Sequence, residues 1–289
     1  MSRTDLLARL GGGATTVCRC WRLVRRDGRA YGFTDHDRDL SFEGVTFKAG
    51  TGISARMLLQ TTGLGVDNTE AAGALSAAGL TEAEIAAGRF DGAEVTAWLV
   101  DWSAPEARMV EFRGSFGDLV RGAGGFTAEL RGLSAPLNEA QGRAYLARCG
   151  AVVGDSRCRV DLAAATFGIE VALELVEGDT LLWFAPGGAI DGFADRWFEK
   201  GRVSVLDGAA AGLWGAVKAD RLSGTGREVE LWQGLRAPLA AGDRVRITAG
   251  CDKLAETCRG KFGNLLNFRG FPTIPGEDWL TVAPSKSRR

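Results

Sequence analysis

Hydrophobic and polar residues alternate over many short stretches of this chain, as in β-strands that bury one face. The predicted strands cover residues 17–24, 30–34, 40–42, 45–48, 94–102, 108–117, 125–131, 168–175, 181–184, 202–206, 215–222, 228–231 and 244–247. Arg26–Arg29 and Glu43–Gly44 have the composition of tight hairpin turns between neighbouring strands. The 41 glycines supply many further turns. The pattern therefore predicts a mainly β chain.

Helices are predicted at two places. Thr81 and Glu84 stand at capping-box spacing at the start of a helix over 81–87. A short amphipathic helix is predicted over 136–147, leading into Cys149. The predicted fold is thus mainly β with a few short helices, in two β-barrel-like domains. The first comprises residues 1–148 and the second residues 149–289, with a C-terminal extension.

Four of the six cysteines form two separated pairs, Cys149 with Cys158 and Cys251 with Cys258. A core cysteine normally lies in an apolar run, whereas these lie in segments rich in glycine and charge. Nearby positive charge stabilises thiolates. The basic residues near the pairs are Arg148, Arg157, Arg159, Arg259 and Lys261. Two such pairs predict four thiolate ligands for one metal centre.

The spacings bear on which metal the thiolates would hold. Cys-x8-Cys and Cys-x6-Cys are wider than the Cys-x2-4-Cys knuckles of structural zinc. A four-iron cluster presents its iron atoms at separate corners, so the spacing favours an iron–sulfur cluster, with zinc as the alternative. Two disulfides, or four unrelated thiols, are the remaining interpretations. A shared centre would clamp together the two ends of the segment between the pairs.

Other reactive side chains are few. Cys18 and Cys20 stand two apart in a predicted strand, which places them on one face as small core residues; a redox pair or a nucleophile is the alternative. His36 is the one histidine, and its acidic surroundings predict a solvated or salt-bridged turn. Asp35, Asp37 and Asp39 have the spacing of the first three ligands of a calcium-binding loop, but Leu40 occupies the position that needs glycine. No catalytic residue is predicted, and the protein is not expected to be an enzyme.

Charge and hydropathy exclude several classes of protein. A net charge of −1 without a basic stripe argues against sequence-specific binding of nucleic acid. The N-terminal sixteen residues lack the apolar core of a signal peptide, and no apolar stretch is long enough to cross a bilayer. The chain is therefore expected to be made in the cytoplasm, where structural disulfides are disfavoured.

Three segments together carry a family resemblance: residues 32–40 (GFTDHDRDL), the pair Cys149 and Cys158, and Cys251-x6-Cys258 running into residues 261–276 (KFGNLLNFRGFPTIPG). They resemble the baseplate hub family of siphophage tails, including the hubs of alphaproteobacterial gene transfer agents. The resemblance covers nearly the whole chain. These hubs are in turn similar to the tail-tip protein L of phage lambda, which carries an iron–sulfur cluster on four cysteines.

The resemblance implies an architectural role. It implies a homotrimer of two-barrel subunits at the tail axis, adapting the sixfold tail to a threefold tip in the baseplate of a phage-like particle. Its expected neighbours are the distal tail protein ring, a tail-tip or fibre-type protein and the tape measure protein, with DNA passing through the channel. The implied ligands of a 4Fe-4S cluster are Cys149, Cys158, Cys251 and Cys258. The 92 residues between the two pairs make the analogy with protein L looser. A tail-tip cell-wall hydrolase, or another metal-dependent enzyme, is the alternative function.

Overall fold

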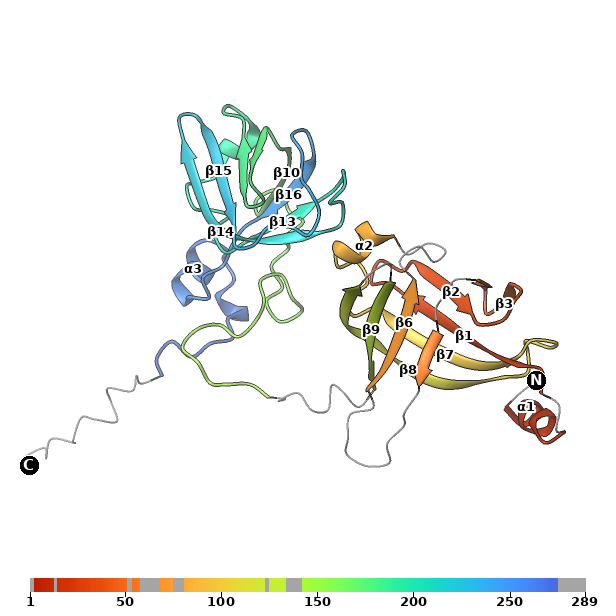
Figure 1. Cartoon of the computed structure of the whole chain (residues 1–289). Helices are drawn as coiled ribbons and strands as arrows, with labels where there is room; N and C mark the ends of the chain where they lie inside the picture. The colour runs from red at the N-terminus through yellow and green to blue at the C-terminus, as the bar shows by residue number, and fades with distance from the viewer. Residues whose placement is uncertain are drawn as a thin grey trace, which may run out of the picture. The chain divides into compact units, whose positions relative to one another are not determined.

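The computed structural model describes residues 3–12, 15–50, 54–57, 68–74, 81–122, 125–133 and 142–274, and for residue 3 and residues 54–57, 68–74, 118–122 and 125–128 it describes the backbone alone. The chain divides into two compact units, residues 1–140 and 141–289. Both are built mainly from strands, with three short α-helices in the described ranges, so the predicted fold class is confirmed (Figure 1). No helix in these ranges is long and apolar enough to cross a membrane.

The first unit contains one nine-stranded sheet. In spatial order its strands are β3 (Leu40–Phe42), β4 (Val45–Lys48), β2 (Ala30–Thr34), β1 (Val17–Val24), β7 (Glu94–Asp101), β8 (Arg108–Gly122), β9 (Gly125–Gly132), β6 (Asn68–Ala74) and β5 (Ser54–Met57). All neighbours are antiparallel except β2 and β4, which are parallel. The two predicted hairpins at 26–29 and 43–44 are confirmed, whereas β5 and β6 were not predicted.

Strand β1 lies in the middle of this sheet and is buried on both faces. Cys18 and Cys20 point to one face, where they pack with Phe42, Phe47 and Trp98. Trp21 and Leu23, on the other face, belong to a second cluster beneath helix α2 (Glu82–Ala86). The prediction that the two cysteines are core residues is confirmed.

Local sequence signals predicted only one of the two helices of the first unit. The Thr81 hydroxyl accepts a hydrogen bond from the Glu84 backbone nitrogen at 3.2 Å, so the predicted cap is confirmed. Helix α1 (Arg3–Leu10) was not predicted. It is held by Leu6, which is fully buried, and by Arg9, whose guanidinium lies 2.5 Å from the Asp101 carboxylate. Its formation therefore depends on contacts distant in sequence.

The second unit is a seven-stranded sheet that closes on itself. In spatial order its strands are β10 (Gly168–Ala172), β16 (Arg244–Thr248), β13 (Arg202–Val205), β14 (Trp214–Ser223), β15 (Gly226–Leu231), β12 (Leu181–Phe184) and β11 (Leu175–Glu177). The prediction of one strand over 168–175 is wrong, because the chain turns a corner there. Leu173 exchanges hydrogen bonds with Asp243 and Gly242, next to β16, while the Glu174 backbone nitrogen donates to Trp183 of β12. This corner joins the two edges of the sheet into a small barrel.

The segment leading into Cys149 is not helical. Residues 142–147 form no helix, so the predicted helix over 136–147 is wrong there, and residues 136–141 lie outside the described residues. Phe271 donates its backbone N–H to Leu146 O instead, and the Tyr145 and Phe271 rings lie 4.9 Å apart. Pairing with a distant extended segment has replaced helical hydrogen bonds. The helix that does form near the cysteines, α3 (Ala255–Gly260), was not predicted.

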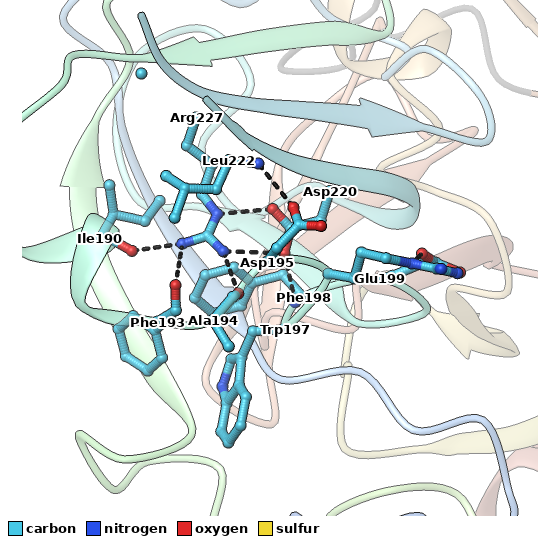
Figure 2. Close-up of polar contacts among 12 residues, drawn as sticks. Ile190, Phe193, Ala194, Asp195, Trp197, Phe198, Glu199, Asp220, Leu222 and Arg227 are labelled. Carbon is cyan, nitrogen blue, oxygen red and sulfur yellow. Dashed lines mark hydrogen bonds and ion pairs between the residues drawn. The ribbon is translucent and has the colours of Figure 1, made fainter. Parts of the chain in front are cut away.

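An ion pair lies inside the barrel. Arg227 of β15 and Asp220 of β14 have side chains with 0% exposure, and their Nε and Oδ1 atoms are 2.7 Å apart. Figure 2 shows the guanidinium also donating to three carbonyls of the β12–β13 connection, those of Ile190, Phe193 and Ala194. The second Asp220 oxygen accepts the Phe198 backbone N–H at 2.8 Å. One buried ion pair thus attaches the β12–β13 connection to strands β14 and β15. This connection includes the 3-10 turn η2 (Ala189–Gly192).

Arg227→Met should lower the free energy of unfolding of the second unit by about 3–5 kcal/mol, because it leaves the buried Asp220 carboxylate without its cationic partner and removes the side-chain donor of three carbonyls. Hydrogen exchange at the barrel amides measures this loss. Arg221→Met is the matched control, since its pair with Glu228 lies at the surface and should contribute less than about 1 kcal/mol. Equal losses in the two variants would contradict this account.

Candidate functional site

The structure brings the four paired cysteines together. Cys149, Cys158, Cys251 and Cys258 line one pocket of the second unit, and Cys258 belongs to helix α3. Cys258 is buried and the other three are half-buried. Apolar side chains form much of the remaining wall, among them Ala151, Val153, Val160, Leu254, Phe262 and Phe268. Residues about a hundred positions apart thus share a small, largely apolar cavity.

Backbone hydrogen bonds hold the two cysteine-bearing segments side by side. The Cys149 backbone nitrogen donates to Lys253 O at 2.9 Å, and the Gly150 nitrogen donates to Arg269 O at 3.1 Å. Cys251 lies three residues after the end of β16, and in between Gly250 passes against the backbone of Glu199 so closely that a Cβ on Gly250 would collide with it. The barrel strand therefore delivers Cys251 to a fixed position beside Cys149.

Cys158 is placed by a tight turn. The Asp155 carboxylate accepts the backbone N–H groups of Cys158 at 2.6 Å, Val152 at 2.9 Å and Arg157 at 2.9 Å. These hydrogen bonds, that from Cys158 first, keep the pKa of Asp155 below its usual value. The charged form of Asp155 is the one that organises the turn.

Three of the four sulfurs accept hydrogen bonds from N–H groups. The Arg269 backbone nitrogen lies 3.3 Å from Cys149 Sγ, and the Lys253 backbone nitrogen lies 3.4 Å from Cys251 Sγ. The Asn264 side-chain nitrogen lies 3.7 Å from Cys158 Sγ. The fourth sulfur, Cys258 Sγ, donates to Asn264 O at 3.3 Å. N–H groups directed at sulfur stabilise thiolates and set the properties of a metal bound to them.

The electrostatic environment also reflects the closeness of the sulfurs. Burial raises the pKa of the Cys251 thiol, and the Lys253 backbone N–H and charge oppose this in part. Burial raises the pKa of Cys258 as well, and the neighbouring sulfurs of Cys251, Cys149 and Cys158 raise it further. Four thiolates in this pocket would repel one another, so they require a cation to remain ionised together.

The basic residues near the cysteines act in different ways. Lys261 is half-buried, and its ammonium donates to Gly250 O at 2.9 Å and to Trp197 O at 2.5 Å. Its charge also acts on Cys251, although burial lowers the pKa of Lys261. Arg157 donates to Gly150 O and Arg159 to Ser156 O, so both bind backbone rather than sulfur. Arg148 and Arg259 are exposed.

Metal-ligand geometry is not present as the side chains stand. Across the ranges that the structure describes, no group of three or more His, Cys, Asp or Glu side chains is arranged to hold a metal ion. All six cysteines are free, and none forms a disulfide. The four thiols share one pocket without meeting at a common point, with Cys258 turned toward the Asn264 carbonyl. Their donor chemistry fits a metal or an iron–sulfur cluster, and the thiols would have to turn inward to bind one.

The remaining candidates from the sequence have ordinary structural environments. Cys20 Sγ donates to the Thr34 hydroxyl at 3.5 Å inside the core. His36 lies in the expected turn with its Nδ1 3.2 Å from Asp37 Oδ1, and its ring packs 5.1 Å from that of Trp102. Asp35 accepts the Arg19 backbone N–H, and Asp39 pairs with Lys48. Asp35, Asp37 and Asp39, which have the spacing of calcium ligands, therefore each interact with a different residue.

Sequence reasoning missed two residues that contact the site, Lys253 and Asn264. Lys253 has φ +68°, a conformation unusual for a side chain larger than glycine, and its ammonium donates to Ala151 O at 2.6 Å. This left-handed conformation accompanies two backbone contacts, the N–H to Cys251 Sγ and the carbonyl to Cys149 N. No local sequence signal marks such a position, whereas Asn264 stands within the motif over 261–276.

Comparison with known proteins gives matches over both units. The family model described as "Baseplate hub protein, N-terminal attachment domain" matches residues 3–161, more than half of the chain. The model described as "Phage conserved hypothetical protein BR0599" matches residues 196–278. A chain in the solved structure "Virion of native gene transfer agent (GTA) particle" is 57% identical with a TM-score of 0.91, and the match covers 99% of this chain and 97% of that chain. No curated protein matches the chain.

Lys253→Gly should leave the second unit more stable than Lys253→Ala by about 1 kcal/mol. Both variants lose the bond to Ala151 O, but glycine adopts the left-handed conformation without a steric cost. At most positions the order is reversed, because glycine is the more flexible residue in the unfolded chain. Thermal unfolding of the two variants measures the difference. A more stable alanine variant would show that this conformation carries no strain.

Proposed function

Because the chain belongs to the baseplate hub family of phage-like tails, we propose that it is a structural hub of such a tail, made in a bacterial cytoplasm and assembled into the baseplate of a particle. The observation that carries this proposal is the 57% identity, over 99% of the chain, to a chain in a gene transfer agent particle. At this identity and coverage a shared architectural role is the simplest interpretation.

We further propose that the hub is a homotrimer on the tail axis. Two barrel-like units in each of three subunits would present six similar modules to a sixfold tail ring and retain threefold symmetry toward the tip. The expected neighbours are the distal tail protein ring, a tail-tip or fibre-type protein and the tape measure protein.

Exposed aromatic residues on the second unit support contacts with other proteins. The side chains of Trp214 and Trp232 are 55% and 63% exposed. Trp214 lies in β14, and the Trp232 backbone N–H donates to Ala216 O of the same strand at 3.0 Å. The Arg202 guanidinium lies 4.4 Å from the Trp214 ring centre, and the Lys218 ammonium lies 6.0 Å from that of Trp232. Tryptophan and arginine are enriched among the residues that dominate interface energy. A surface of this kind suits burial in an assembly.

For the cysteine site we propose a 4Fe-4S cluster held by Cys149, Cys158, Cys251 and Cys258, with zinc as the alternative. Support comes from the four thiols in one pocket, from the N–H groups directed at three of the sulfurs and from the apolar wall. A bound cluster would supply a rigid cross-link between segments 149–158 and 251–258. Its role in this proposal is structural.

We do not assign an enzymatic activity. A tail-tip hydrolase needs a nucleophile with a usable base, or metal ligands with an open coordination position. The single histidine pairs with Asp37, and a site with four thiolate ligands leaves no position for water. These features favour a structural protein.

Protein purified without oxygen should be brown, with broad visible absorbance and equal amounts of iron and acid-labile sulfide. Changing any of the four cysteines to Ser should remove the colour and lower the thermal midpoint, because ligand binding contributes directly to folding free energy. Stoichiometric zinc without sulfide would rule out the cluster and leave the alternative metal.

Cys18→Ala and Cys20→Ala serve as the controls for the series, since both residues lie in the core of the first unit. They should retain the iron and shift the thermal midpoint less. A loss at Cys18 comparable to that at Cys149 would contradict the assignment of the ligands.

In an intact particle the protein should be present as three copies around the tail axis. A cryo-EM map of the particle would measure both copy number and position. Six copies, or a position away from the axis, would contradict the trimeric hub. A trimer in isolation is not required, because neighbouring rings can supply much of the interface that stabilises it.

A further inference from the structure

Asn264 contacts one cysteine of each pair. Its side-chain nitrogen donates to Cys158 O at 2.5 Å and lies 3.7 Å from Cys158 Sγ. Its backbone carbonyl accepts from Cys258 Sγ at 3.3 Å, and its backbone nitrogen donates to Cys258 O at 2.9 Å. The residue therefore joins the segment before the barrel strands to the segment after them, directly beside two sulfurs.

The orientation of the Asn264 amide is fixed by its neighbours. The Asn267 side-chain nitrogen donates to Asn264 Oδ1 at 2.7 Å, so the Asn264 nitrogen must face Cys158, where it meets two acceptors. Asn267 lies in the 3-10 turn η3 (Leu265–Asn267) and lines the same pocket. The two amides thus form a short chain of hydrogen bonds that ends at Cys158 Sγ.

The end of helix α3 brings Asn264 to this position. Gly263 has φ +58°, and its backbone nitrogen donates to Arg259 O at 3.2 Å, which reverses the chain after the helix. The reversal returns Asn264 to Cys258, near the middle of the helix. A side chain other than glycine at 263 would strain this reversal.

We propose that Asn264 is a positioning residue of the cysteine site: its amide orients Cys158 and donates to that thiolate, and its backbone N–H, bonded to Cys258 O, holds the Cys258 backbone at the same wall of the pocket. This inference rests on the proposed metal site and deepens it. An N–H···S bond draws electron density from the sulfur, so it favours the more reduced, more negative state of a bound cluster. A purely structural asparagine would have no such effect on a bound metal.

The test uses the full-length chain with two substitutions. Asn264→Ala removes the amide, and Asn264→Asp keeps its shape but replaces the donor with a carboxylate facing Cys158. In anaerobically purified protein, both variants should shift the reduction potential of the cluster to more negative values, with the larger shift for Asp. In metal-free reduced protein, Co²⁺ titration followed by thiolate-to-cobalt absorbance should show affinity reduced by about tenfold to a hundredfold.

Two further variants separate positioning from stability. Val229→Ala removes buried volume from the barrel core without touching a sulfur, so it should lower the thermal midpoint but leave the reduction potential and Co²⁺ affinity unchanged. Asn267→Ala removes the hydrogen bond that orients the Asn264 amide but leaves Asn264 itself unchanged. It should therefore shift the reduction potential and the Co²⁺ affinity in the same direction by smaller amounts. If the Asn264 variants do not fold, the reduction potential and Co²⁺ affinity of Asn267→Ala test the inference in their place.

The outcomes distinguish this inference from the proposed cluster. Wild-type reduction potential and Co²⁺ affinity in the Asn264 variants would overturn the inference and leave the cluster intact. A wild-type protein that binds Co²⁺ on its thiolates but purifies without iron would overturn the cluster, and the Co²⁺ series would then decide the role of Asn264. Wild-type protein that binds neither metal would overturn both.

Discussion

The buried pair between Arg227 and Asp220 links the barrel core to the cysteine pocket. It fixes the connection over 190–198, and the Trp197 carbonyl in that connection accepts both the Gly250 backbone N–H and the Lys261 ammonium. Gly250 precedes Cys251, and Lys261 follows the helix that contains Cys258. Because an uncompensated charge inside the barrel is so unfavourable, this arrangement has few alternatives. The position of two of the four thiols therefore depends on an ion pair that touches none of them.

The cysteine site is organised largely by hydrogen bonds that need no metal. Cys149 and Gly150 bond to Lys253 and Arg269, and the Asp155 carboxylate builds the turn that ends in Cys158. A pocket organised in this way loses less conformational entropy when a ligand binds than an unstructured set of cysteines would lose. In many small metal-binding domains the metal itself organises the fold, whereas here the barrel already holds the two cysteine pairs together.

Local signals predicted most strands and both hairpins, because alternation and turn composition are properties of adjacent residues. The corner at Leu173 and Glu174 was missed because the strand pattern runs through it, and only pairing with β16 and β12 reveals the bend. The helix predicted over 136–147 is absent from 142–147 for the same reason, since the partner of this segment, Phe271, is far away in sequence. The cysteine pairs could be recognised from spacing and surroundings. The roles of Lys253 and Asn264 could not, because one depends on a backbone angle and the other on contact across more than a hundred residues.

The hydrogen bonds between segments 146–150 and 253–271 also define a path for mechanical force. A pull applied to the chain before Leu146 and after Phe271 meets these bonds first, so the load passes across the base of the unit. The barrel strands between Cys158 and Cys251 lie outside that path and behave as an insertion shielded from tension. A cross-link among the four thiols would strengthen the loaded segment itself. The second unit can therefore carry strain between its ends while the face formed by its strands keeps its shape.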